Sequence, residues 1–428
     1  MTNLAAVDLS DNRLTSLVLP EGLERLTTLS LNGNQLTNLT VPSSIPNLAA
    51  LYVGSNRLGD FTFLNRFTGL QILEIGENSL SNLTLPSGLG KLTSLRIAGY
   101  QLTNLSLLSA MPQLTSLNLG KNRLTDFSFL AGLPGLATLE IDRTGIPDLT
   151  LPNGLTTLTD LIIHGEYLTS LVLSEGLSNL STLQIDSSRL AHLTLPDGLN
   201  HLTELRLNGK RLTGLVLPEG LTRLVTVDLS YNRLTNLTFR GSFPSLKSIN
   251  VSHNQLARLA LPDGLTNLTA LYLGYNRLTD FSFLSRLGHL TTLNIEGHKL
   301  ISLTLPVELA NLTTLELGDN PPQMLILPER LVEGALVETV AQLAMQGVSI
   351  SSYPLEISLQ SARWTSGGAF ELLLTGPPGT YHLQSTTDFV IWNEDGVLTN
   401  SLGRAAFTDA TANASGHKFY RAHAAPNP

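Results

Sequence analysis

Two carboxylates and an imidazole recur at 22-residue intervals in the middle of the chain, as Asp142, His164 and Asp186. These side chains are competent ligands for a divalent metal. If each lies on its own strand of a parallel sheet, the backbones are held about 4.8 Å apart and the side chains project alike instead of converging. We therefore expect no metal and no cofactor here. We interpret the residues as part of a polar partner-binding surface, with solvated surface decoration or a metal site as the alternatives.

Patterns that commonly mark an active site are missing from the sequence. It contains no H-E-x-x-H, no G-x-S-x-G, no Walker loop and no dinucleotide-binding fingerprint. The cysteine count is 0, which excludes disulfides, thiolate metal sites and a cysteine nucleophile. We expect that this chain is not an enzyme.

The charge balance and the apolar runs exclude further classes. The chain has 26 Lys and Arg against 34 Asp and Glu, a net charge of −8 without any basic block, so nucleic-acid binding is not expected. Polar residues interrupt every apolar run before the roughly 18 residues of a membrane span. The start, MTNLAAVDLS, lacks the charged and apolar regions of a secretory signal. We expect a secreted or cell-surface protein whose signal was removed, with a cytoplasmic protein as the alternative.

An internal repeat organises most of the chain. The pattern L-x-x-L-x-L-x-x-N-x-L opens at 22-residue spacing, without insertion or deletion, at Leu4, Leu26, Leu48, Leu70, Leu92, Leu114, Leu136, Leu158, Leu180, Leu202, Leu224, Leu246, Leu268, Leu290 and Leu312. We number these repeats 1 to 15 and count positions from the opening leucine. The alternation in L-x-x-L-x-L predicts one short strand per repeat, and the remaining half returns the chain to the same edge. The pattern thus predicts a parallel sheet of fifteen strands.

These motifs resemble those of the leucine-rich-repeat family, as in LTTLSLNGNQL from Leu26 to Leu36, and the resemblance covers residues 1 to about 328. The resemblance implies an α/β-type repeat solenoid, a horseshoe with a parallel inner sheet. It also implies a non-enzymatic scaffold that binds a protein or peptide on its concave face. A carbohydrate-binding surface protein is the alternative function.

The second half of each repeat comes in two forms. Most read L-T-x-L-x-L-P-x-G-L, which predicts a short outer strand ended by Pro and Gly. Three read D-F-x-F-L, at 60–64, 126–130 and 280–284, and we expect their phenylalanines to pack in the core.

Asparagine at position nine is expected to close the turn after the strand, because its amide both donates and accepts. Six repeats depart from it, with Tyr100, Thr144, Glu166, Ser188, Lys210 and His298. Four of the departures are consecutive, in repeats 7 to 10. Locally broken rules often mark function. Drift in a redundant ladder is the alternative explanation.

The repeat register stops after Asn320. We expect a solenoid at 1–328 and a cap at 329–353, with a helix at 329–346 carried by Val332, Leu336, Val340 and Leu343 and a closing strand at 348–353. Residues 354–428 carry short apolar segments between Gly, Pro and Asn, which predict a small all-β sandwich. The strings QSTTDFVIW and FTDATANASGHKFYRA resemble a compact module near the C-terminus of secreted bacterial proteins.

Two patches on the predicted concave face are candidates for binding a partner. The acidic patch consists of Glu140, Asp142, Arg143, His164, Glu166, Tyr167, Asp186 and Arg206. The aromatic patch consists of Tyr231, His253, Tyr272 and Tyr275. Tyrosine and arginine are enriched in interface hot spots. Exposed aromatic rings can also stack on sugar rings. A surface ladder of mutually packed side chains is the alternative interpretation of the aromatic patch.

Overall fold

The structure is a computed structural model. It describes residues 3–43, 45–78, 82–99, 102–106, 111–142, 146–186, 189–207, 209, 211–320, 323–412 and 417–425. The chain divides into an N-terminal body, Met1–Gly264, and a C-terminal body, Leu265–Pro428.

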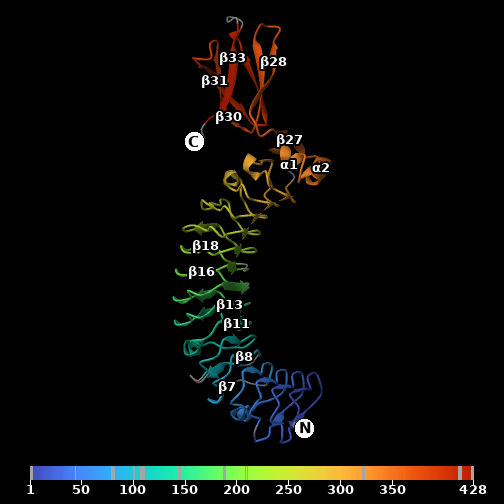
Figure 1. The fold of residues 1–428 in the computed structure, drawn as a ribbon, viewed down its shortest axis with the longest axis vertical. Coiled ribbons are helices and arrows are strands. Elements are labelled where there is room, and N and C mark those ends of the chain that lie inside the picture. The colour runs from blue at the N-terminus through green and yellow to red at the C-terminus, as the bar shows by residue number, and fades with distance from the viewer. Residues whose placement is uncertain are drawn as a thin grey trace. The chain divides into compact units, whose positions relative to one another are not determined.

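Each repeat contributes one inner strand, and the inner strands follow chain order in a fifteen-stranded parallel sheet. Those of the N-terminal body are β1 (Ala6–Asp8), β3 (Thr28–Ser30), β5 (Ala50–Tyr52), β6 (Ile72–Glu74), β8 (Ser94–Arg96), β10 (Ser116–Asn118), β11 (Thr138–Asp142), β13 (Asp160–His164), β15 (Thr182–Asp186), β17 (Glu204–Arg206), β19 (Thr226–Asp228) and β21 (Ser248–Asn250). Those of the C-terminal body are β22 (Ala270–Tyr272), β23 (Thr292–Asn294) and β25 (Thr314–Glu316). Figure 1 shows β8, β11 and β13 succeeding one another along the N-terminal body. The predicted fifteen-stranded sheet is confirmed.

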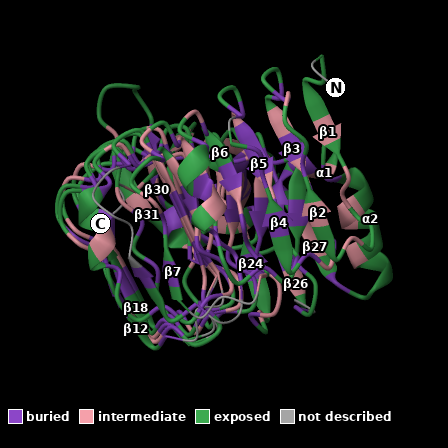
Figure 2. Ribbon diagram, turned by 90° about the horizontal axis from the view of Figure 1, so that it is seen from below, coloured by how far each residue is buried: buried purple, intermediate pink, exposed green. Residues whose placement is uncertain are grey.

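Leucines at fixed positions of the repeat form a continuous core. Leu26, Leu29, Leu31 and Leu36 of repeat 2 are 0% exposed, and the same four positions are buried in repeat 3 and in repeats 5 to 13. Figure 2 shows the buried residues running along the strands. A single repeat cannot cover its own leucines, so the core exists only because neighbouring repeats stack.

The asparagine ladder works as predicted in the repeats that keep it. In repeat 2, the Asn34 side chain donates to the carbonyl oxygens of Leu9 (2.9 Å) and Leu31 (3.1 Å) and accepts from the Leu14 N–H (3.0 Å). Asn34 itself is buried. One amide therefore ties the turn of its own repeat to the preceding repeat.

Outer strands are formed by the return halves of most repeats. They are β2 (Ser16–Val18), β4 (Asn38–Thr40), β7 (Asn82–Thr84), β9 (Asn104–Ser106), β12 (Asp148–Thr150), β14 (Ser170–Val172), β16 (His192–Thr194), β18 (Gly214–Leu217) and β20 (Asn236–Phe239), with β24 (Ser302–Thr304), β26 (Met324–Pro328) and β27 (Ser349–Tyr353) in the C-terminal body. They pair in sets of two or three parallel strands.

The three D-F-x-F-L repeats carry a 3₁₀ helix in place of an outer strand. These helices are η1 (Thr62–Arg66), η2 (Ser128–Gly132) and η3 (Ser282–Arg286), and a fourth, η4 (Val307–Leu309), lies in repeat 14. The Asp60 carboxylate accepts from the Thr62 N–H at 2.8 Å and so supports the first turn. Three of the six phenylalanines in these D-F-x-F-L motifs, Phe61, Phe127 and Phe283, are buried as expected for core residues, whereas Phe63, Phe129 and Phe281 are partly exposed.

The cap differs from the sequence prediction in one respect, because the helix expected at 329–346 is interrupted. It consists of α1 (Glu329–Val332) and α2 (Val337–Met345). Leu331 and Leu336 are both buried, and the break between them lets both side chains reach the core. At Gly334 an added Cβ would lie 2.5 Å from the Arg330 carbonyl oxygen, which is too close. Glycine has no Cβ and therefore fits at this turn of the chain. The closing strand β27 pairs with β26, as predicted.

Two three-stranded antiparallel sheets follow the cap. One consists of β28 (Ser358–Trp364), β29 (Phe370–Thr375) and β32 (Arg404–Asp409). The other consists of β30 (Gly379–Thr386), β31 (Asn393–Asn400) and β33 (Phe419–Ala424). Phe370 of the first sheet stacks on Tyr420 of the second, with ring centroids 5.5 Å apart. We call residues 354–428 the C-terminal module; its boundary and those at 328 and 353 stay predictions.

Candidate partner-binding surface

Three neighbouring inner strands are longer than the others. Strands β11, β13 and β15 have five residues each, whereas the other inner strands have three. Their repeats hold Thr144, Glu166 and Ser188 at position nine instead of asparagine. An asparagine amide would bond the carbonyls of positions six and seven, as Asn56 bonds those of Val53 and Gly54. In repeats 7 to 9, which lack this asparagine, the residues at positions six and seven pair with the neighbouring strands and lengthen the sheet.

The extended part of these strands carries the residues singled out from the sequence. Asp142, His164 and Asp186 are register partners in adjacent strands. The His164 Nδ1 lies 2.9 Å from the Asp186 Oδ2, which also accepts from the Gln184 Nε2 at 2.9 Å. The side chains of His164 and Asp186 are 38% and 35% exposed. The structure thus brings these groups together with enough exposure to reach a ligand.

Beside this column lies a second one, at position five. Glu140, Ile162, Gln184 and Arg206 are register partners across β11, β13, β15 and β17. Asn118 donates to the Glu140 carboxylate at 2.6 Å, and Arg206 pairs with Glu204 of its own strand. Arg206 therefore neutralises a carboxylate that the sequence prediction did not include.

Acidic side chains dominate this part of the sheet. The five inner strands here are β10, β11, β13, β15 and β17. Their carboxylates are Glu140, Asp142, Asp160, Asp186 and Glu204, and Arg206 is the one Lys or Arg that they carry. Opposite charge is therefore the simplest complement for this surface.

The residues at the margins of the acidic patch were identified less completely from the sequence. Arg143 lies outside the described residues. Glu166 and Tyr167 are exposed, and the Arg189 guanidinium lies 4.9 Å from the centre of the Tyr167 ring. This distance is typical of a cation–π contact. The sequence prediction missed Arg189, although it occupies the same position in the next repeat as Tyr167.

Metal-binding geometry is not found at these residues. Across the described ranges, no group of three or more His, Asp and Glu side chains is arranged to hold a metal ion. His164 instead uses its Nδ1 on a carboxylate.

Position eight adopts a left-handed backbone in most of the repeats in which it is described, with Gly99, Gly165 and Gly209 as exceptions. Its non-glycine residues have φ between 53° and 59° and are Asp11, Ser55, Glu77, Lys121, Tyr231, His253, Tyr275 and Asp319. Such a conformation is uncommon for residues other than Gly, Asn and Asp. The alternation of glycine and polar residues at this position in the sequence was a signal of that conformation.

The aromatic patch contains a stacked pair, as in the alternative interpretation of a surface ladder. Tyr231 and His253 stack face to face, with ring centroids 4.3 Å apart and an interplanar angle of 9°. Stacked rings cover one another's faces, so this pair resembles a surface ladder more than a platform for a sugar ring.

Tyr272 and Tyr275 belong to the C-terminal body. Tyr272 is the register partner of Asn294. The Tyr275 hydroxyl donates to the Asp319 carboxylate at 2.7 Å. A Cβ on Gly297 would lie 2.6 Å from the Tyr275 ring, so glycine there makes room for it.

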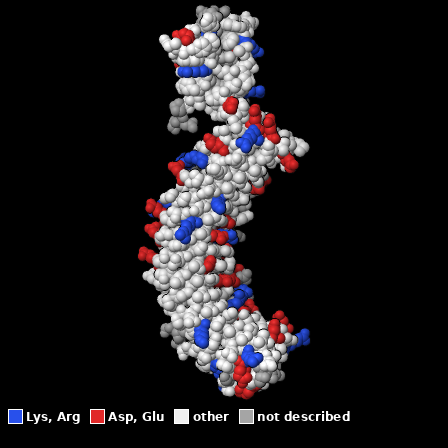
Figure 3. Space-filling view, viewed as in Figure 1, with Lys and Arg blue, Asp and Glu red and all other residues white. Residues whose placement is uncertain are grey.

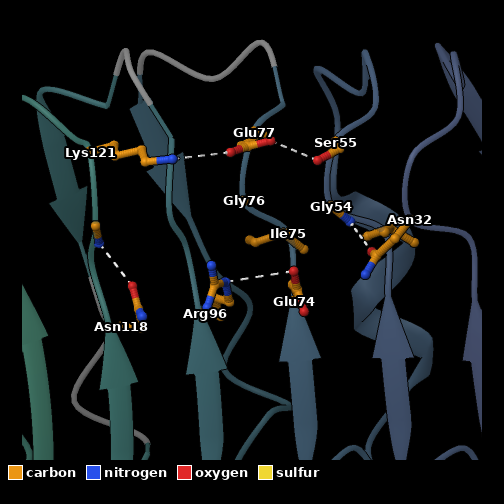
Figure 4. Close-up of polar contacts among 12 residues, drawn as sticks. Asn32, Gly54, Ser55, Glu74, Ile75, Gly76, Glu77, Arg96, Asn118 and Lys121 are labelled. Carbon is orange, nitrogen blue, oxygen red and sulfur yellow. Dashed lines mark hydrogen bonds and ion pairs between the residues drawn. The ribbon is translucent and has the colours of Figure 1, made fainter. Parts of the chain in front are cut away.

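A polar network on repeats 2 to 6 was not predicted from the sequence. Figure 4 shows it, with Glu74 and Arg96 3.6 Å apart on neighbouring strands. Ser55 donates to Glu77 at 2.8 Å, and Lys121 lies 3.8 Å from the same carboxylate. Opposite charges compensate one another here, which distinguishes this region from the acidic patch.

Charged side chains are sparse elsewhere on the face seen in Figure 3, where they occur singly or in small groups without a large basic area. Within the described part of the chain, no helix is long and apolar enough to cross a membrane.

Comparison with known proteins identifies the repeats. Residues 2–44, 24–66 and 244–286 match a family described as leucine rich repeats (2 copies), and residues 142–232 match one described as a BspA type leucine rich repeat region (6 copies). No curated protein matches the chain.

Solved structures with the same type of fold are found at low sequence identity. YopM from Yersinia enterocolitica WA-314 is 23% identical over 76% of this chain and 75% of that chain, with a TM-score of 0.51. An internalin (inlF) from Listeria monocytogenes is 21% identical over 74% of this chain and 82% of that chain, with a TM-score of 0.45. The functional domain of InlJ from Listeria monocytogenes is 19% identical over 88% and 83%, with a TM-score of 0.47. The matches to the two family models and to YopM, together with the 22-residue register and the parallel inner sheet, show that the fold is the leucine-rich-repeat solenoid.

Proposed function

We propose that this chain is a non-enzymatic scaffold that binds a protein or peptide on the inner sheet of its N-terminal body, at repeats 6 to 10. The observation that carries the proposal is the set of extended strands β11, β13 and β15, which bring Asp142, His164 and Asp186 into register. Both a loss of the asparagine ladder and a concentration of carboxylates coincide there.

The partner chemistry follows from the charges. The five inner strands β10, β11, β13, β15 and β17 carry five carboxylates and one arginine. A ligand rich in Lys, Arg or hydrogen-bond donors complements such a surface, and its association weakens as salt screens the charges. A carbohydrate ligand is the alternative, but Tyr231 and His253 do not favour it, because their ring faces contact each other. Secretion or surface exposure stays a prediction, to be tested by fractionating the source cells.

A peptide selection tests the proposal. A library of random 12-residue peptides displayed on phage is selected on the full chain and, in parallel, on the Asp142→Ala/Asp186→Ala variant. We expect Lys-rich and Arg-rich sequences to be enriched on the former alone. The matched control is Glu175→Ala/Asp197→Ala, which removes two exposed carboxylates from the return halves of the repeats. Equal enrichment on all three proteins would contradict the assigned surface.

A further inference from the structure

The turn between β30 and β31 presents apolar side chains to solvent. Phe389, Val390 and Ile391 are 61%, 79% and 63% exposed. Phe419, at the start of β33, is 40% exposed, and its ring centroid lies 4.0 Å from that of Phe389. Phe389 also contacts Trp392, at 6.5 Å between centroids. We call these five residues the apolar tip; three consecutive exposed apolar residues of this size need an explanation.

Four backbone N–H groups of the turn are bonded within the turn itself. The Thr386 Oγ1 accepts from the N–H groups of Asp388 (3.2 Å) and Phe389 (3.0 Å). The Asp388 Oδ1 accepts from those of Val390 (2.9 Å) and Ile391 (3.0 Å). Four consecutive amide groups thus need no partner from water or from another chain. This condition applies to backbone that enters a lipid environment, where an unsatisfied N–H is very costly.

These hydrogen bonds also fix the backbone conformation of the turn. Phe389 has φ of 57°, in the left-handed region that a bulky residue seldom adopts. The bonds from the Thr386 and Asp388 side chains hold it there. Strain of this kind tends to be retained where it serves a function, and here its effect is to turn the Phe389 side chain outward.

The groups that flank the tip are those found at the boundary between lipid and water. The Arg421 guanidinium lies 4.1 Å from the centre of the Trp392 ring and donates to the Gln384 side chain at 2.9 and 2.8 Å. Tryptophan is enriched at the depth of lipid headgroups, and arginine can reach phosphate from there. The lysine nearest to the apolar tip in the sequence is Lys418, and it is bonded to Asp395 and Asp409.

We propose that the apolar tip inserts into the interfacial region of a lipid bilayer and so docks the C-terminal module on a membrane surface. The N–H groups of residues 388–391 are all bonded within the turn, so its exposed apolar side chains are what it offers to a partner. Asp388 and Arg421 balance in charge, so the proposed lipid is zwitterionic phosphatidylcholine and anionic lipid is not required. This proposal is independent of the concave-face function.

Vesicle binding tests the proposal directly. The full chain, in a Trp364→Phe background that leaves Trp392 as its one tryptophan, is mixed with phosphatidylcholine vesicles with and without phosphatidylglycerol. We expect cosedimentation with both vesicle types and a blue shift of Trp392 emission. Val390→Glu/Ile391→Glu should weaken binding at least tenfold, because it places two charges in the inserted turn. The matched control is Val172→Glu/Ile301→Glu, at outer-strand and loop side chains that are 52% and 70% exposed, and it should bind as the unsubstituted chain does.

Three results would overturn the proposal. One is the lack of binding by the unsubstituted chain to either vesicle type. Another is equal binding by the tip variant and its control. The third is a dimer in sedimentation experiments without lipid that the tip variant dissociates, which would assign the tip to contact between two copies of this chain.

Discussion

The side chain of the asparagine at position nine stabilises the contact between neighbouring repeats. Asn254 donates to the carbonyl oxygens of Leu229 and Val251, each at 3.0 Å, and accepts from the Leu234 N–H at 2.8 Å. Asn254→Ala leaves these buried groups without a partner, so we expect a loss of about 2 to 3 kcal/mol in the free energy of unfolding, measured with urea.

The first repeat supplies the control for that substitution. Asn12 occupies the same position but is exposed, and its donors reach the carbonyls of Leu9 and Ser10 only. Asn12→Ala should cost less than about 1 kcal/mol because water replaces the lost bonds. Equal costs at the two positions would contradict the role assigned to burial.

His298 shows that a departure from asparagine can preserve its structural role. Its Nδ1 lies 3.0 Å from the carbonyl oxygens of both Ile295 and Glu296, the two groups that an asparagine amide would bond. The Nε2 is buried without a hydrogen-bond partner, and the ring packs against Phe281. The sequence prediction named His298 only as a departure from asparagine, because ring placement cannot be deduced from residue type alone.

Burial lowers the pKa of His298, although its bonds to the backbone oppose the shift. A histidine whose pKa is depressed in the folded state binds fewer protons there than in the unfolded chain, so its contribution to stability is present above about pH 6.5 and is lost as the pH falls. We expect the C-terminal body to lose stability between pH 7 and pH 5. His298→Asn should flatten that dependence in urea titrations at the two pH values. An unchanged pH dependence would show that another group is responsible.

At the scale of elements, the repeat register accounts for what the sequence could predict. Fifteen inner strands, the outer strands and the closing strand β27 follow from alternation and spacing, because each depends on local pattern. The extension of β11, β13 and β15 could have been predicted only in part. It coincides with the loss of asparagine at position nine, but β8 and β17 belong to repeats that also lack this asparagine and have three residues each. The break between α1 and α2 could not, because it depends on where Leu331 and Leu336 meet the core.

The same limit applies to the candidate site. Spacing alone placed Asp142, His164 and Asp186 in one row, and the register confirms it. The pairing of Arg206 with Glu204 and of Tyr231 with His253 depends on side-chain rotation, which the repeat does not determine. The apolar tip was missed because QSTTDFVIW was considered only for its resemblance to a compact module.

The inner strands make one stability prediction at the element scale. Leu205 of β17 is 0% exposed and lies between Leu183 and Val227. Leu205→Ala should lower the free energy of unfolding by about 2 to 5 kcal/mol, because it removes buried methyl groups and leaves a cavity. Val172→Ala, at a half-exposed side chain of β14, should change it by less than about 0.5 kcal/mol. A loss below about 1 kcal/mol for Leu205→Ala would contradict its place in the core.

At the scale of the whole molecule, the solenoid should be least stable in its first repeat. Leu9 and Leu14 remain partly exposed, whereas the equivalent Leu31 and Leu36 are 0% exposed. Figure 2 shows the same contrast between β1 and the strands β3 and β5. Because each repeat is stabilised by its neighbours, we expect faster amide hydrogen exchange in repeat 1 than in repeats 5 to 10 of the same chain. Uniform protection along the N-terminal body would show that another contact covers this end.

The distribution of charge along the whole chain leads to the last prediction, which concerns the patch that receives the partner. A peptide obtained from the selection on repeats 6 to 10 should bind Asp142→Ala/Asp186→Ala at least tenfold more weakly, because two carboxylates that face it are gone. Its association rate with the unsubstituted chain should fall as salt is raised. The thermal midpoint of the double variant should stay within a few degrees, since neither side chain belongs to the leucine core. Tyr231→Ala/Tyr275→Ala keeps all the carboxylates and should bind nearly as well as the unsubstituted chain. If the tyrosine variant loses binding while the aspartate variant keeps it, the aromatic residues form the contact surface and the acidic patch does not.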